Sequence, residues 1–159
     1  MAAGSSVSTE SEQNKFVLTR IFDAPLDRVW EAWSDRTQMA QWLGPRGFTG
    51  EILKMDTRVG GSYSYVMHAP DGTDHWVQGT YREIVPRARL VYTWIWTDPA
   101  GNPAGPDTLV TVEFAAQGDK TRITLEHALF QTASDSDNHE KGWSSCFDHF
   151  ADYLASVSK

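Results

Sequence analysis

Two aromatic stretches near opposite ends of the chain decide the fold. Residues 24–33 read APLDRVWEAW, and residues 142–154 read GWSSCFDHFADYL. In the first stretch, apolar residues recur at spacings of three and four, which predicts one apolar stripe on a helix of about ten residues. The second stretch belongs to a longer amphipathic pattern and predicts a helix close to the C-terminus.

The segments beside the first helix extend the pattern. Alternation from Lys15 to Ile21 predicts a first strand, and Asp35 is placed to cap a second short helix whose apolar face includes Trp42. Residues 1–14 are small, polar and without periodicity, so we expect a disordered tail there. The remaining residues, 15–159, are expected to form a single domain.

The middle of the chain predicts six strands. Turn signals at Gly60-Gly61, Asp71-Gly72, 85–89 and Gly118-Asp119 separate short runs that alternate between apolar and polar residues. Residues 98–106 carry three prolines and two glycines and predict a long loop. Together with the first strand, these runs predict an antiparallel sheet of about seven strands in an α+β fold.

The turns also predict which side chains face inward. A hairpin symmetric about Asp71-Gly72 would pair Met67 with Trp76, and the turn at 85–89 would pair Ile84 with Leu90. Both turns then select the same inward face. Its members are Tyr63, Tyr65, Met67, Trp76, Leu90, Tyr92, Trp94 and Trp96.

The C-terminal helix is expected to cross this face. Asp137 and Glu140 have the spacing of a capping box, and a helix of about twenty residues would span roughly 30 Å. Its apolar stripe comprises His139, Trp143, Cys146, Phe147, Phe150 and Leu154. A sheet curved around such a helix tends to leave an interior space, and an interior space favours a small ligand.

Composition excludes several function classes. The net charge is -7, and Lys and Arg are scattered singly, which argues against nucleic acid as a partner. An uninterrupted apolar run of the length that spans a membrane does not occur. Cys146 is the only cysteine and the first fourteen residues lack a signal-peptide pattern, so we expect a cytoplasmic protein. A homodimer through exposed apolar surface stays an open alternative.

The order of elements and several short motifs resemble a known family. The motifs are Ala24-Pro25, Val29-Trp30, Trp33, Trp42, Gly60-Gly61, Gly79, Leu90, Trp94 and Gly142-Trp143. Over about residues 15–157, the chain is similar to bacterial relatives of the activator of heat-shock-protein-90 ATPase, within the START and pollen-allergen-like (SRPBCC) superfamily. The resemblance implies a helix-grip fold with a hydrophobic cavity between the sheet and the C-terminal helix. The eukaryotic activator carries a further N-terminal domain that docks on the chaperone, and this sequence has no room for one, so chaperone association is not expected from the resemblance.

An aromatic set is the candidate binding surface, because flat rings line apolar pockets and their polar edges orient ligands. The candidate ligand-binding residues are Tyr63, Tyr65, Trp76, Tyr92, Trp94, His127, Trp143 and Phe147. Plain core packing is the competing interpretation, and it is favoured for Trp30, Trp33 and Trp42.

Polar candidates for chemistry are few. His127 is expected to point inward, either as an acid or base or as a structural histidine. Arg82 has inward parity and could bind an anion or simply reach solvent. His68 and His75 flank a hairpin but are expected to face outward, so we predict no metal site. Cys146 is expected to be an inert buried thiol, and no cofactor motif is present.

Three functions remain open from the sequence. The favoured one is binding of a small, largely hydrophobic or aromatic molecule in an internal cavity, without catalysis. The first alternative is an enzyme of cyclase, dehydratase or hydrolase type that uses His127 and Tyr65 as acid or base. The second is a co-chaperone-like module that binds protein through its outer surface.

Overall fold

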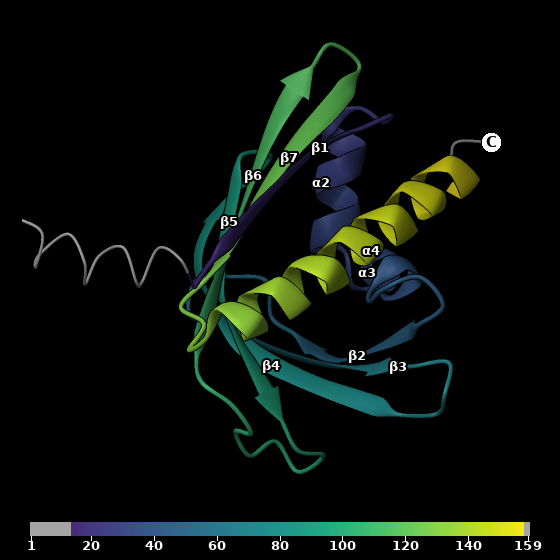
Figure 1. Cartoon of the computed structure of the whole chain (residues 1–159). Helices are drawn as coiled ribbons and strands as arrows, with labels where there is room; N and C mark the ends of the chain where they lie inside the picture. The colour runs from purple at the N-terminus through teal and green to yellow at the C-terminus, as the bar shows by residue number, and fades with distance from the viewer. Residues whose placement is uncertain (1–13, 158–159) are drawn as a thin grey trace, which may run out of the picture.

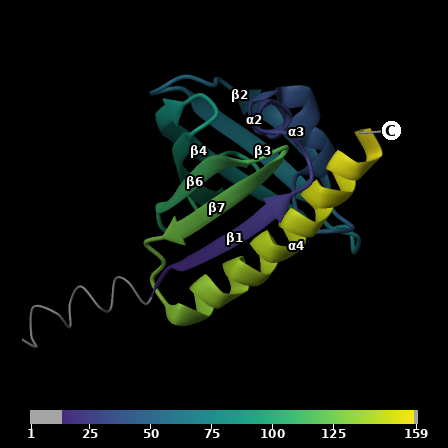
Figure 2. The ribbon, with the colours of Figure 1, turned by 90° about the horizontal axis from the view of Figure 1, so that it is seen from above.

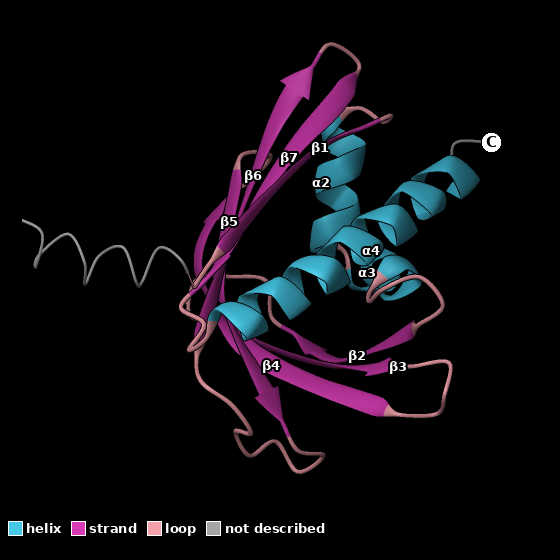
Figure 3. Ribbon diagram, viewed as in Figure 1, coloured by secondary structure: helices cyan, strands magenta, loops and turns pink. Residues whose placement is uncertain are grey.

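A computed structural model describes residues 14–157 of the chain. The tail expected over residues 1–14 therefore lies, apart from Asn14, outside the described residues. The elements are β1 (Phe16–Phe22), α2 (Leu26–Ser34), α3 (Arg36–Trp42), β2 (Thr49–Met55), β3 (Ser62–His68), β4 (Asp74–Val85), β5 (Arg89–Thr97), β6 (Thr108–Gln117), β7 (Lys120–Ala128) and α4 (Ala133–Val157) (Figures 1 and 3).

The seven strands form one antiparallel sheet in the order β1-β7-β6-β5-β4-β3-β2. The sheet curves around α4, and α2 and α3 lie on the same concave side, toward the C-terminal end of α4 (Figures 1 and 2). The predicted α+β helix-grip fold is confirmed. Among the described residues, no helix is long and apolar enough to cross a membrane.

Local sequence explains the two short helices. Pro25 occupies the N-cap of α2 in extended conformation, where its missing N–H costs no helical hydrogen bond. The Asp35 side chain accepts a hydrogen bond from the backbone N–H of Gln38 at 3.0 Å, so the predicted cap of α3 is confirmed.

The long helix begins earlier than the sequence predicted. Thr132, not Asp137, caps it, because the Thr132 hydroxyl accepts from the backbone N–H of Asp135 at 3.0 Å. This start adds a turn before the predicted capping box and gives α4 25 residues. The extra turn brings His139 well inside the helix, over the sheet.

The predicted register of the β3–β4 hairpin is wrong by one residue. Met67 pairs with His75, and Val66 pairs with Trp76. Ala69 and Thr73 close a three-residue loop in which Gly72 has a φ of 91°, so the turn is centred on Asp71 rather than on the Asp71-Gly72 bond. An odd loop reverses the parity of β4 relative to a two-residue turn.

A bulge at the other end of β4 reverses the parity again. Ile84 pairs with Leu90 as predicted, but Tyr81 pairs with Tyr92 and leaves Arg82 as the extra residue. Arg82 is exposed, so its predicted inward position is wrong. The odd loop and the bulge cancel, so the inward faces predicted for β3 and β5 are correct. Only the part of β4 before the bulge presents the opposite side chains to the inside. His75 and Tyr81 consequently face inward, and Trp76 faces the convex side.

Candidate ligand-binding site

The structure contains a large pocket of about 270 Å³ between the first half of α4 and the sheet. Strands β3, β4 and β5 provide one wall, and the segment after α3 provides another. The lining residues are Leu43, Gly44, Pro45, Phe48, Tyr65, Met67, His75, Trp94, Trp96, Asn138, His139, Gly142, Trp143 and Cys146. We call this site the large pocket.

The sheet and helix walls of the large pocket are aromatic. The Trp94 ring lies 5.3 Å from that of Trp143 and 5.8 Å from those of Tyr65 and Trp96, measured between ring centroids. The contacts of Trp94 with Tyr65 and Trp96 are edge-to-face, so these rings do not cover one another by stacking. This arrangement suits a flat apolar molecule.

The lining of the large pocket contains no carboxylate, ammonium or guanidinium group, because none of the lining residues, all from the described part of the chain, is Asp, Glu, Lys or Arg. Burial raises the pKa of Cys146 to about 12 and the pKa of Tyr65 well above its usual range, so both remain protonated at neutral pH. An ionised ligand would lose its hydration here without gaining a counter-charge.

His127 lies behind the pocket wall and is fully buried. The Trp143 indole donates to His127 Nδ1 at 3.0 Å, and the Thr108 hydroxyl donates to the backbone carbonyl of Trp94 at 2.6 Å. Thr108 Oγ1 must then accept from His127 Nε2–H, at 2.8 Å. Both ring nitrogens are engaged in one fixed neutral tautomer, and burial lowers the pKa of His127 well below its usual value.

His139 forms a second pair of this kind at the pocket itself. The Trp96 indole donates to His139 Nε2 at 2.9 Å, and His139 Nδ1–H donates to the Asp135 carbonyl at 2.7 Å. Burial lowers the pKa of His139, which keeps the ring neutral. The two Trp–His bonds fix the orientation of two of the indoles that line the pocket.

A small void of about 20 Å³ lies beside the large pocket. Leu43, Tyr65 and Trp143 line both spaces. The other aromatic residues around the small void are Trp33, Trp42, Tyr63, Tyr81 and Tyr92. A space of this size accommodates about one water molecule.

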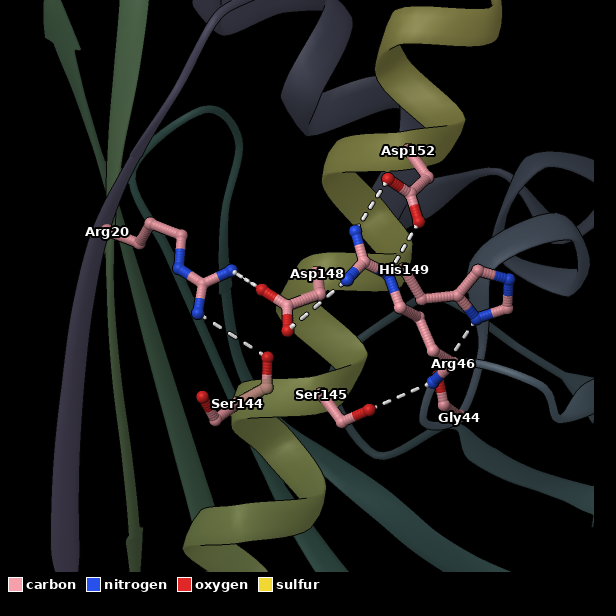
Figure 4. A network of polar contacts seen from close by, with 8 residues as sticks. All are labelled: Arg20, Gly44, Arg46, Ser144, Ser145, Asp148, His149 and Asp152. Atoms are coloured by element: carbon pink, nitrogen blue, oxygen red, sulfur yellow. Dashed lines mark hydrogen bonds and ion pairs between the residues drawn. The ribbon is translucent and has the colours of Figure 1, made fainter.

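The segment around Gly44 and Arg46, which closes one side of the large pocket, is held against α4 by hydrogen bonds and an ion pair (Figure 4). The Arg46 guanidinium donates to both carboxylate oxygens of Asp152, at 2.8 and 2.9 Å, and its backbone N–H donates to the Ser145 hydroxyl at 3.0 Å. His149 Nδ1 donates to the Gly44 carbonyl at 3.0 Å. These contacts hold the pocket-lining Gly44 and Pro45 against the helix.

The structure distributes the eight predicted site residues over several places. Tyr65, Trp94 and Trp143 line the large pocket, and Tyr63 and Tyr92 line the small void. His127 and Phe147 are buried behind Trp143 and line neither space. Trp76 was predicted to face inward and does not, because the β4 register is shifted.

Several lining residues were missed as site candidates. His75 was placed outward by the wrong register, and Phe48 and Pro45 were not among the candidates. His139 carried a usable signal, because it lies four residues before Trp143 on the predicted apolar stripe.

The hairpin histidines do not assemble a metal site. His68 Nδ1 lies 2.7 Å from Asp74 and its Nε2 lies 3.4 Å from Glu51, whereas His75 lies on the opposite face. Within residues 14–157, no group of three or more His, Cys, Asp or Glu side chains could hold a metal ion.

Comparisons with known proteins identify the family. The family model for activator of Hsp90 ATPase homolog 1-like proteins matches residues 23–155. A solved structure from Chromobacterium violaceum is 31% identical, with 87% of this chain and 94% of that chain covered and a TM-score of 0.77. The AHSA1 protein from Silicibacter pomeroyi is 27% identical, with 90% and 99% covered and a TM-score of 0.80.

A protein from Arthrobacter aurescens is 25% identical, with 92% of this chain and 88% of that chain covered and a TM-score of 0.83. The comparison with curated proteins gave no match. The family match spans most of the chain, and the similar structures share its sheet and long helix. The chain therefore belongs to the family of activator of Hsp90 ATPase homolog 1-like proteins, within the START-like (SRPBCC) superfamily.

Proposed function

We propose that this protein binds a small, largely hydrophobic or aromatic molecule in the large pocket. The observation that carries the proposal is a space of about 270 Å³ that is lined by indole and phenol rings and by no described Asp, Glu, Lys or Arg. Ligand sites commonly measure about 300–1,000 Å³ and combine apolar walls with a few polar groups. The pocket therefore suits a molecule at the small end of this range.

Within this proposal, the predicted site residues have different tasks. Tyr65, Trp94 and Trp143 contact the ligand, and Tyr63 and Tyr92 support Tyr65 from the small void. His127 and Phe147 are positioning residues, since His127 accepts from the Trp143 indole and Phe147 packs on the same ring at 6.4 Å. Residues 15–159 act as one domain.

Binding is favoured over acid–base catalysis through His127. A general acid or base must lie within hydrogen-bond reach of the substrate group that it protonates or deprotonates. Both His127 nitrogens are committed to Trp143 and Thr108, and the ring does not line the pocket. Burial raises the pKa of Tyr65, the other residue proposed for catalysis, well above its usual value, so its phenol stays protonated at neutral pH and no phenolate is present to act as a base.

A cytoplasmic location and the state of assembly are also proposals. A free, buried Cys146 fits a cytoplasmic protein. A homodimer and a chaperone partner are secondary proposals, and neither involves the large pocket.

The test combines native mass spectrometry with titration of the neutral dye N-phenyl-1-naphthylamine, whose fluorescence rises in apolar surroundings. Gly142→Leu is the decisive variant, because no atom lies within 4 Å of a Cβ added at Gly142, and a leucine there would project into the large pocket. Ala133→Leu on the exposed start of the same helix is the matched control.

We expect saturable dye binding to the wild type and to Ala133→Leu, and loss of at least tenfold in affinity in a folded Gly142→Leu variant. Trp94→Ala should also weaken retention of any co-purifying molecule. Dye binding that is absent from the wild type, or unchanged in Gly142→Leu, would refute the proposal.

A further inference from the structure

Unpaired polar groups surround the two adjoining spaces. The indole nitrogens of Trp33 and Trp94 are enclosed and have no hydrogen-bond partner. The hydroxyls of Tyr65 and Tyr92 likewise form no hydrogen bond with another described residue, in contrast to the Tyr63 hydroxyl, which donates to the Thr93 carbonyl at 2.5 Å. Tyr65 and Tyr92 are only 4% and 6% exposed, so bulk water does not replace the missing partners.

All of these unpaired groups can donate. An indole N–H is a donor only. Burial raises the pKa of Tyr65 and of Tyr92 well above 10, so both phenols keep their protons. The Thr93 carbonyl accepts from Tyr63 and the Trp94 carbonyl accepts from Thr108, so these two buried oxygens already have partners. The site therefore has an excess of donors, and a bound molecule must supply the acceptor.

The charges decide what kind of acceptor fits. Burying a carboxylate or phosphate costs far more hydration free energy than burying a carbonyl oxygen, and a positively charged partner is the usual compensation. The large pocket has no Lys or Arg among its described lining residues, and Lys54, at the rim of the small void, is exposed to solvent. An uncharged oxygen, as in a ketone, aldehyde or amide, satisfies a phenol or indole N–H without this penalty.

Tyr65 is the residue best placed to bind such an oxygen. It lines both spaces, and its ring lies 5.6 Å from Tyr63 and 5.8 Å from Trp94, between ring centroids. Its hydroxyl is not among the fully enclosed polar atoms, which means that it borders free space. We propose that Tyr65 determines specificity by donating a hydrogen bond to a neutral carbonyl oxygen on the ligand. This inference rests on the proposed binding function.

Three naphthalene probes of nearly equal size test the inference. 2-Acetylnaphthalene carries a neutral carbonyl, 2-ethylnaphthalene carries no oxygen, and 2-naphthoate carries a negative charge. Their affinities at pH 7.5 are measured by displacement of N-phenyl-1-naphthylamine. The variants are Tyr65→Phe, which removes only the hydroxyl, and Tyr153→Phe, which removes the surface hydroxyl that donates to Gln38.

In the wild type and in Tyr153→Phe, we expect the ketone to bind about tenfold more tightly than the ethyl compound, which corresponds to about 1.4 kcal/mol. In Tyr65→Phe this preference should fall to about twofold or less, with little change for the ethyl compound. The naphthoate should bind most weakly.

Equal binding of the ketone and ethyl probes in the wild type would overturn the inference, as would a preference that survives in Tyr65→Phe. Tightest binding by the naphthoate would also overturn it and would point to Lys54 as the determinant. In each of these cases the proposed binding function stands. If none of the three probes displaces a bound dye, the inference is overturned as well, whereas the binding function fails only if the dye itself does not bind.

Discussion

The two halves of α4 cover regions of opposite character that are built from the same residue types. Under its C-terminal half, five rings are at most 2% exposed, namely Phe22, Trp33, Trp42, Phe147 and Phe150, and of the two spaces they border only the small void of about 20 Å³. We call this the packed half. Under the N-terminal half, an equally aromatic set borders the large pocket, and we call this the open half.

The difference follows from where the short helices lie. In the packed half, α2 and α3 lie beside α4 on the concave side of the sheet (Figure 1), and the Trp42 ring lies 4.7 Å from that of Phe150, between ring centroids. In the open half, only the segment from Leu43 to Phe48 enters, and it contributes mainly small or partly buried groups. The free volume beside the sheet therefore depends on where α2 and α3, the helices between β1 and β2, lie. It does not depend on the composition of the sheet face.

The largest expected effect is a truncation in the packed half. Phe150→Ala should lower the free energy of unfolding by about 3–5 kcal/mol, because it removes a fully buried ring and leaves a cavity that its neighbours cannot fill. Phe48→Ala in the open half should cost less than half as much, since Phe48 is partly exposed and borders space already. Urea unfolding at pH 7.5 measures both values, and equal losses would contradict the division into two regions.

Most of the fold was predictable because periodicity and turn residues are local signals. The stripes on residues 26–33 and 139–154 and the capping residue Asp35 correctly predicted α2, α4 and the start of α3. The errors in strand register lie in β4. A three-residue loop and a single bulged residue leave the alternation of β4 almost unchanged, yet each shifts the register by one.

The candidate site was predictable in part for the same reason. Strand parity identifies the inward rings Tyr65 and Trp94, but it says nothing about free volume beside them. Whether a ring fills a core or lines a pocket depends on residues remote in the sequence, such as Pro45 and Gly142. The Trp143–His127 and Trp96–His139 hydrogen bonds also join distant segments, so no spacing rule reveals them.

Acidification should loosen the open half before the packed half. The pKa of His127 is lowered in the folded state by burial and by neighbouring His139, so the unfolded chain takes up a proton at a higher pH than the folded chain does. Stability should therefore be complete above about pH 6.5 and decline as pH falls, by up to about 1.4 kcal/mol per pH unit for His127. His139 acts in the same direction. Urea unfolding between pH 7.5 and 5 measures the decline.

His68 provides the control for this pH dependence. Its pKa is raised, chiefly by its hydrogen bond to Asp74, so its stabilising contribution is present at low pH and is lost as pH rises. His68→Gln should thus leave the acid-side decline in place or make it steeper. The indole N–H resonances of Trp96 and Trp143 should shift during acidification before those of the packed half. Simultaneous loss of all indole signals, or a stability that rises below pH 6.5, would contradict this prediction.

The smallest effect is expected from one methyl group at the pocket wall. Gly142 lies inside α4, and nothing lies within 4 Å of a Cβ added there. Gly142→Ala should therefore raise the free energy of unfolding by about 0.5–1 kcal/mol, because alanine restricts the unfolded chain and favours helix without a clash. Gly79→Ala is the opposite case, since its Cβ would lie 2.0 Å from the Thr93 carbonyl oxygen and 2.7 Å from the Tyr63 ring. Thermal and urea unfolding should separate the two variants in sign. A destabilised Gly142→Ala would mean that the wall of the large pocket is as tightly packed as the rest of the core.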